Sequence, residues 1–142
     1  MAHTMSDEEW RAFVSAGTRT GKLATTRADG SPHVAPVWFL LDNDEIVFNT
    51  GADTVKGRNL ARDGRAVLCV DDDDPPYAFA TLQGEVSLHD DLAEMLPWAT
   101  RIAARYVGEA RAEEFGRRNA VAGELLVRMR VKKVVALADM TG

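Results

Sequence analysis

The chain has 142 residues, of which 46% are hydrophobic and 27% are charged. This length suits one domain with one core, and the composition lacks the low hydrophobicity and high charge that keep a chain disordered. The net charge of -5, from 17 basic and 22 acidic residues, argues against a nucleic-acid-binding protein, because phosphate binding needs a basic face.

The first residues carry no recognisable targeting signal. Residues 1–5 are expected to be a disordered start or an added remnant ahead of a natural start at Met5. No apolar run approaches the roughly 20 residues that cross a bilayer. We therefore expect a cytoplasmic protein without membrane contacts, in which residues 6–142 form a single domain.

A short helix and a β-hairpin should come next. Ser6 is a good N-cap ahead of acidic first-turn residues, and apolar residues then follow at helical spacing. Residues 22–27 and 33–41 are mostly apolar or β-branched, and an Asp-Gly turn joins them. The second arm is apolar on both faces, which favours a strand covered on both sides. Pro36 interrupts it, since proline cannot donate to a sheet ladder and so marks an edge, a bulge or a gap.

The middle of the chain predicts two further strands around a basic helix. Residues 45–50 form a strand, and a short helix capped by Asp53 follows. A buried strand over 65–70 contains Cys69, the only cysteine, which is expected to be a structural thiol in a reducing compartment. Residues 71–76 carry four adjacent carboxylates and two prolines, so we expect a solvated loop there rather than a cation site.

The remaining elements are a long strand, two helices and a last strand. Residues 77–89 predict the long strand, with a bulge at Gly84. Residues 92–106 have the spacing of an amphipathic helix. Pro97 predicts either a kink in this helix or a helix that begins only near Leu96. A short helix fits 110–119, and the final strand from Leu125 alternates until a bulge near Lys132. About six strands with two helical insertions predict a small mixed barrel, mainly β within the α+β class.

Three segments together resemble one known family. They are 21–26, 30–39 and 50–63, and the Lys-x-Arg-Asn-Leu stretch in the last is the most specific. The chain is similar to the pyridoxamine 5'-phosphate oxidase-like FMN-binding split barrels, most closely to their actinobacterial branch that uses the deazaflavin coenzyme F420. The resemblance implies a six-stranded split β-barrel with short flanking helices. It also implies a homodimer with two coenzyme sites at the subunit interface.

The resemblance assigns coenzyme-binding roles to residues of this chain. The coenzyme ring would lie along Pro36, Val37 and Trp38, and its edge or the ribityl chain would be bonded by Asn49 and Thr50. The phosphate-bearing tail would be held by Lys56, Arg58 and Asn59. The coenzyme would be covered by Tyr77 of the partner subunit. The physics of the basic helix agrees, because free N–H groups at a helix start attract anions. Lys56 adds a point charge there, and Arg58 can hold two phosphate oxygens.

Each assignment has a purely structural alternative. The basic helix face can be simply solvated, and Asn59 can be a cap or turn residue. Trp38 can belong to the core, Asn49 and Thr50 can merely close their strand, and Tyr77 can pack on its own barrel.

Neither a catalytic residue nor a metal site is predicted. The three histidines are scattered without metal-ligand spacing, and no nucleophile with an adjacent base can be found. A coenzyme that carries a hydride would supply the reactivity. The leading hypothesis is an F420-dependent reductase of an electron-poor conjugated small molecule. The alternatives are an oxidase or flavin reductase that uses FMN, and a non-catalytic flavin or deazaflavin carrier or sensor.

Overall fold

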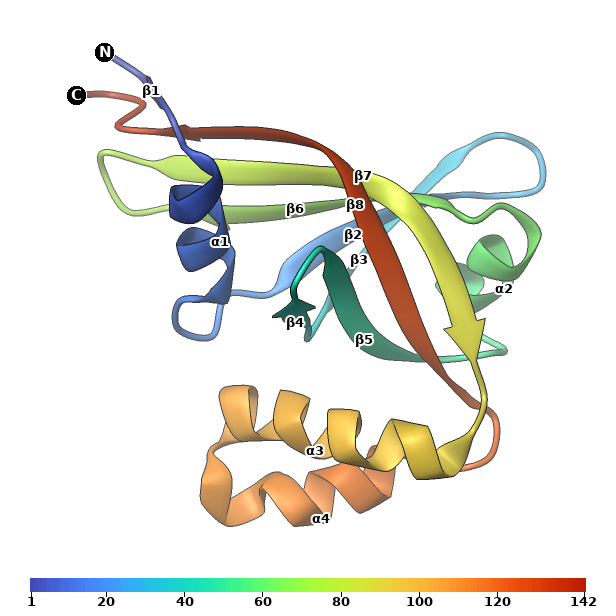
Figure 1. Cartoon of the computed structure of the whole chain (residues 1–142). Helices are drawn as coiled ribbons and strands as arrows, with labels where there is room; N and C mark the ends of the chain where they lie inside the picture. Colours follow the sequence, from blue (N-terminus) through green and yellow to red (C-terminus); the bar gives the residue numbers. More distant parts are fainter.

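One antiparallel sheet of eight strands runs through the molecule, with four helices around it (Figure 1). The computed structural model describes all 142 residues. The strands are β1 (His3–Thr4), β2 (Gly21–Thr26), β3 (Pro32–Val37), β4 (Leu40–Asp42), β5 (Glu45–Gly51), β6 (Arg65–Asp72), β7 (Ala78–His89) and β8 (Glu124–Ala138). The helices are α1 (Asp7–Ser15), α2 (Val55–Arg62), α3 (Leu92–Val107) and α4 (Glu109–Asn119). The expected mainly β class is confirmed.

The strand order makes a split barrel. Along the sheet the order is β3-β2-β6-β7-β8-β5-β4, and β1 pairs with β8 outside this path. The two ends, β3 and β4, are separated in sequence only by Trp38 and Phe39. The chain itself therefore closes the sheet, because it leaves the β2 ladder and joins the β5 ladder within these two residues.

Two sequence expectations about the strands are wrong. Residues 33–41 do not form one continuous arm, because β3 pairs with β2 while β4 pairs with β5. Of the two alternatives for residues 1–5, a disordered start or an added remnant, the first is wrong, because His3 and Thr4 pair with Ala138 and Leu137 of β8. The broken arm and this added strand account for eight strands instead of six.

Apolar side chains from every wall of the barrel fill its interior. The main core cluster includes Trp10, Leu23, Phe39, Ile46, Phe48, Leu68, Leu82, Val127 and Met129. A second, smaller cluster of Val47, Met95 and Leu126 lies between the outer face of β5 and β8 and the helix α3. Both faces of β5 are therefore covered, which leaves its polar residues Asn49 and Thr50 in enclosed positions.

A bulge at Gly84 and a cap at Thr54 shape the ends and edges of these elements. The Gly84 bulge is confirmed by a register shift between Gln83 and Gly84, which leaves Lys132 of β8 without a partner. A Cβ at position 84 would collide with the carbonyl of Arg130, so the position requires glycine. The N-cap of α2 is Thr54 and not Asp53, because the Thr54 hydroxyl accepts from the Gly57 amide at 3.1 Å.

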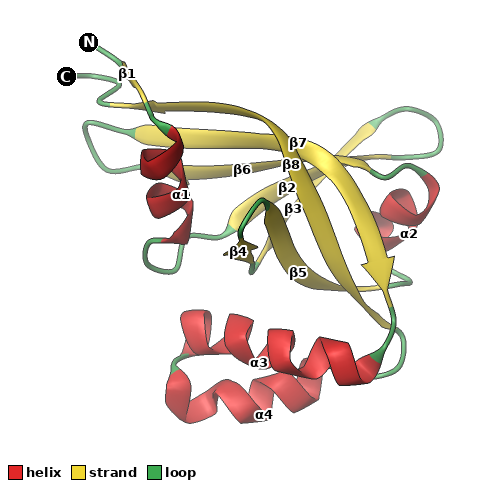
Figure 2. Cartoon of the chain, in the orientation of Figure 1, coloured by secondary structure: helices red, strands yellow, loops and turns green.

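Helices α2 and α3 both contact β5, and they lie on either side of the region between β3 and β5. Helix α2 contacts β2, β3 and β5, while α3 packs on β5 and α4 lies against α3 (Figure 2). Helix α3 begins at Leu92 and includes Pro97, so the late start near Leu96 is not found. None of the four helices is long and apolar enough to span a membrane.

Candidate functional site

A cavity of about 170 Å³ lies where the end of β3, strand β5, helix α3 and the start of β8 meet. Its walls are Trp38, Asn49, Ala99, Ile102, Asn119 and Glu124. Two of the predicted coenzyme-binding residues therefore share one cavity, although Trp38 follows β3 and Asn49 belongs to β5. A larger hollow of about 390 Å³ on the outer face of β2, β6, β7 and β8 contains none of the predicted residues.

Trp38 forms a rigid aromatic wall of this cavity. Its ring stacks on Tyr106 of α3, with ring centroids 5.2 Å apart and an angle of 4° between the planes. Phe115 of α4 lies 6.4 Å from it in a tilted arrangement. The tryptophan is half-buried, so it packs against the helices and still lines the cavity. Its two predicted roles, core residue and ligand contact, are thus compatible.

Asn49 and Thr50 point to opposite faces of β5, as neighbours in a strand must. The Asn49 Nδ2 donates to the Asn119 carbonyl across 3.5 Å, and its Oδ1 is buried without a partner. Thr50 is buried, and its hydroxyl lies 3.2 Å from the hydroxyl of Thr54. The structure therefore places Asn49 at the cavity and uses Thr50 to support the start of α2. An unpartnered buried amide oxygen is costly unless something else satisfies it.

The start of α2 is held close to the end of β5. The Thr54 hydroxyl donates to the Gly51 carbonyl at 2.7 Å, and the first intrahelical bond joins the Arg58 amide to the Thr54 carbonyl. Helix geometry leaves the amides of Val55 and Lys56 without carbonyl partners. A Cβ on Gly57 would collide with the Gly51 carbonyl, so this glycine permits the close approach. No role was predicted for Gly57 from the sequence.

The three predicted tail-binding residues have different surroundings. Asn59 is only 3% exposed, and its Nδ2 donates to Thr25 Oγ1 at 3.0 Å while its Oδ1 accepts from Arg62 at 3.2 Å. Arg58 is exposed and donates twice to the Asp53 carbonyl, at 3.1 and 2.8 Å. Lys56 is half-buried and forms no ion pair within the chain. Asn59 is thus an internal tie between α2 and β2, and only the two cations remain available to a ligand.

Glu124 is the residue that the sequence analysis missed. It begins β8 opposite Gly51, and its Oε2 lies 3.1 Å from the position that a Cβ of Gly51 would occupy. Burial raises the pKa of its carboxyl group, and the positive charge of Lys56 opposes this shift. Glu124 thus connects the cavity to the basic helix. Its position depends on a pairing with a strand far away in sequence, so no local pattern could have identified it.

Pro36, Val37 and Tyr77 do not line this cavity. Pro36 is exposed on β3 opposite Lys22, and Val37 is 6% exposed in the barrel core. Tyr77 is 42% exposed and is the last residue of the loop between β6 and β7, which lies at the end of the sheet away from α2 (Figure 1). Within one chain, Tyr77 therefore cannot reach a ligand at Lys56.

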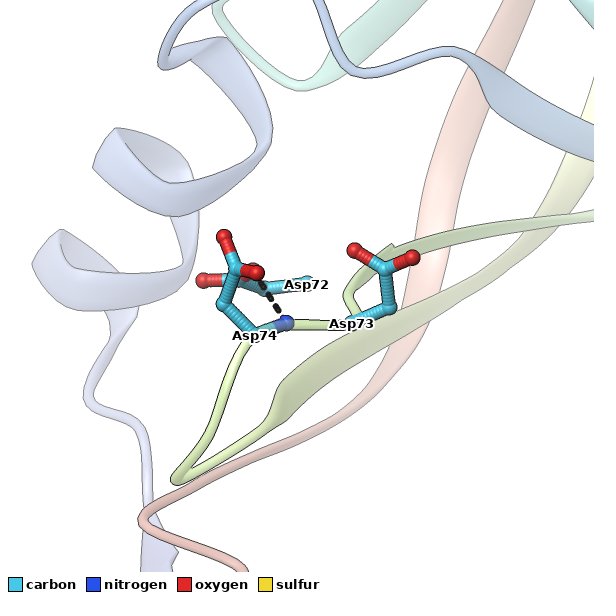
Figure 3. Close-up of side chains that lie close together, drawn as sticks. All are labelled: Asp72, Asp73 and Asp74. Carbon is cyan, nitrogen blue, oxygen red and sulfur yellow. Dashed lines mark hydrogen bonds between the residues drawn. The ribbon is translucent and has the colours of Figure 1, made fainter.

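The acidic loop forms a separate cluster. Carboxylate oxygens of Asp72, Asp73 and Asp74 lie within 4.8 Å of one another, and the Asp74 amide donates to Asp72 at 3.0 Å (Figure 3). Arg19 pairs with Asp72 at 3.3 Å, and Lys22 pairs with the neighbouring Asp71 at 2.8 Å. These cations offset part of the negative charge, and the cluster is remote from the cavity.

Comparisons with known proteins agree with this architecture. Residues 6–137 match the family model described as pyridoxamine 5'-phosphate oxidase. The conserved hypothetical protein Rv2991 from Mycobacterium tuberculosis superposes with a TM-score of 0.82 at 24% identity, covering 95% of this chain and 86% of that one. A protein described as an F420 reductase gives a TM-score of 0.69 at 24% identity, covering 87% and 94%. A FAD-binding protein from Mesorhizobium loti gives 0.72 at 16% identity, covering 96% and 97%. At these identities the likeness to the solved structures shows a shared fold.

Proposed function

The chain belongs to the pyridoxamine 5'-phosphate oxidase family, and on that premise we propose that it is a reductase that uses coenzyme F420 to reduce an electron-poor conjugated small molecule. The observation that carries this proposal is the junction of two unlike surfaces. The cations Lys56 and Arg58 stand at the start of α2, and the aromatic cavity of Trp38 and Asn49 lies beside them. A coenzyme-dependent reductase needs both, because the cations take the anionic tail, the coenzyme ring lies along Pro36, Val37 and Trp38, and the cavity beside Trp38 is left for the substrate.

The residues present fit such a coenzyme. The free amides at the start of α2, together with Lys56 and Arg58, suit a phosphate or carboxylate group. The Asn49 Nδ2, whose only hydrogen bond is 3.5 Å long, suits an acceptor on the ring edge or the polyol chain. When bound, the coenzyme supplies a hydride. The chain's own residues anchor the tail, fix the ring beside Trp38, and exclude water through the cover that α3 and α4 provide.

Assembly completes the proposed site. We place Tyr77 of the partner subunit over the coenzyme, because within one chain the loop between β6 and β7, which carries Tyr77, lies at the end of the sheet away from α2. The functional unit is then a homodimer with two equivalent sites. A flavin in place of F420 is the main alternative, and the similarity to a FAD-binding protein of the same fold favours it. A carrier or sensor would bind the coenzyme in the same way but would not reduce a substrate.

Titration of the protein with F420 and with FMN, followed by fluorescence, tests the coenzyme. F420 should bind more tightly. The double variant Lys56→Ala/Arg58→Ala should lose about 2 to 5 kcal/mol of binding free energy, as expected for two charge-assisted hydrogen bonds. The matched control Arg111→Ala/Arg117→Ala removes two exposed positive charges from α4 and should bind as the parent does. Equal binding by the Lys56/Arg58 variant would remove the basic helix from the site.

A turnover experiment separates a reductase from a carrier. Reduced F420 carrying deuterium at the transferred position is mixed with the protein and a quinone or enone acceptor. The reductase proposal expects the oxidised absorbance band to return at a rate proportional to protein, with the label on a product carbon. Tight binding without turnover over a broad acceptor panel would favour the carrier, and tighter binding of FMN would favour the flavin alternative.

A further inference from the structure

The polar side chains in the cavity leave two oxygen acceptors unused. The Oδ1 of Asn49 is buried and has no hydrogen-bond partner. The carboxylate of Glu124 forms no hydrogen bond or ion pair in the structure, although it lies near the cation Lys56. A buried acceptor without a partner, beside a half-buried carboxylate that is also unpaired, favours a ligand that brings hydrogen-bond donors to them.

The rest of the cavity wall suits a planar group. Trp38 contributes an aromatic face held in place by Tyr106, while Ala99 and Ile102 of α3 contribute apolar surface. A cavity of about 150 Å³ with an apolar lining is large enough to hold benzene. The cavity of about 170 Å³ therefore has room for one ring with a small substituent.

The position of Glu124 decides the charge that this group can carry. Its carboxylate lies over Gly51, at the boundary between the cavity and the start of α2. Burial raises the pKa of Glu124, as happens when a carboxylate lacks compensating hydrogen bonds. An anionic substituent would meet this carboxylate, whereas a cation or an N–H donor would compensate it. The loosely held amide of Asn49, with its 3.5 Å bond, can rotate to present Oδ1 to the same substituent.

We propose that this cavity is a substrate subsite for a planar group that bears N–H donors, such as an amino- or amidino-substituted ring, and that Glu124 is its specificity-determining acceptor. The inference rests on the proposed function, because it names the substrate class of that same site. It assigns opposite electrostatic preferences to two adjoining regions. The start of α2 takes anions, and the cavity behind it takes donors.

A matched pair of probes tests the subsite. Benzamidine and benzoate have nearly the same shape and opposite charge, so calorimetric titration of the full-length protein with each measures the preference directly. Benzamidine should bind at least about tenfold more tightly than benzoate. Glu124→Gln, which keeps the shape of the side chain, should remove most of this difference. Chemical shifts of the Asn49 side-chain amide should move with benzamidine and not with benzoate.

Two controls make the result specific. Glu113→Gln removes an exposed carboxylate from α4, and Asp73→Asn removes one from the acidic loop, so neither should change benzamidine binding. Equal affinity for the two probes, or an unchanged benzamidine affinity in Glu124→Gln, overturns the proposal. The F420 titration distinguishes the two failures. If the parent protein binds F420 but binds benzamidine and benzoate equally, only the subsite proposal is refuted. If the parent protein does not bind F420, the proposed function is refuted.

Discussion

At the scale of single residues, Asn59 shows how a family motif can identify a position without giving its role. The residue belongs to the stretch that resembles the coenzyme-binding motif, yet both ends of its side-chain amide are used inside the protein. A ligand could engage it only by breaking its bonds to Thr25 and Arg62. We therefore assign Asn59 to the support of α2 and not to the coenzyme.

This assignment predicts a loss of stability without a matching loss of binding. Asn59→Ala leaves the buried Thr25 hydroxyl without its partner, which should cost about 1 to 3 kcal/mol of unfolding free energy. Urea unfolding measures this cost, and a cycle with Thr25→Val should show that the two substitutions are not additive. The affinity of folded Asn59→Ala for the coenzyme should change far less than the affinity of Lys56→Ala does. If Asn59→Ala is as stable as the parent but no longer binds the coenzyme, Asn59 is a coenzyme-binding residue after all.

The candidate site also shows which single residues a sequence can reveal. Lys56 and Trp38 were identified because each lies within a continuous segment that resembles the family. Glu124 has no such local context, and its significance comes from pairing with Gly51 across the β5–β8 ladder. Gly57 is similar, because its need for a small side chain depends on the approach of the Gly51 carbonyl.

At the scale of elements, the break between β3 and β4 depends on one side chain of α3. Arg105 donates to the Phe39 carbonyl at 2.8 Å, to the Val14 carbonyl at 2.8 Å and to the Gly17 carbonyl at 2.9 Å. The Tyr106 hydroxyl adds a bond to the Arg19 carbonyl at 2.8 Å. These contacts satisfy carbonyls that no strand partner reaches, and they join α3 to the end of α1. The helix periodicity predicted α3 but could not predict this use of its last turn.

Removing this guanidinium should loosen the split in the barrel. Burial lowers the pKa of Arg105, in keeping with a cation that is bonded to carbonyls and not to a carboxylate. Arg105→Ala should lower the unfolding free energy by about 2 to 4 kcal/mol, because charge-assisted bonds are lost and several carbonyls are left unpaired. Arg105→Lys keeps the charge but not the planar fork, so it should recover only part of the loss. Hydrogen exchange of amides in residues 38–42 should accelerate in both variants, and unchanged exchange would contradict this account.

At the scale of the whole molecule, local patterns predicted the elements, while long-range contacts determined how they close. Turn residues, alternation and the single bulge, which joins Gly84 of β7 to Lys132 of β8, were readable because each depends on neighbours in sequence. The broken strand was not readable, since residues 34–41 are continuously apolar and nothing local marks Trp38 and Phe39 as the point where pairing passes from β2 to β5. The pairing of His3 and Thr4 with β8 likewise joins the two ends of the chain.

Whole-molecule geometry also leads to the last prediction, which is a dimer in solution. The outer face of the sheet carries exposed apolar side chains, with Val34 at 64% and Val135 at 46% exposure. It also carries the hollow of about 390 Å³. A second copy is the occupant that would both cover this face and bring its Tyr77 to the start of α2. Light scattering at micromolar concentration should therefore give twice the mass of 15.5 kDa, and Val135→Glu should shift the protein toward monomer.

Mixing two defective variants tests whether the site is shared. Lys56→Ala/Arg58→Ala keeps Tyr77, and Tyr77→Ala keeps both cations, so each homodimer lacks one half of every proposed site. In a mixed dimer with two-fold symmetry, one of the two sites combines the cations of one subunit with Tyr77 of the other. Each mixed dimer should therefore regain one coenzyme site, while its other site lacks both halves. Coenzyme fluorescence measured after unfolding and refolding the two variants together reports this recovery, and the variants refolded separately are the control. A monomeric parent protein, or a mixture that binds no better than its separate components, would show that Tyr77 does not act across an interface.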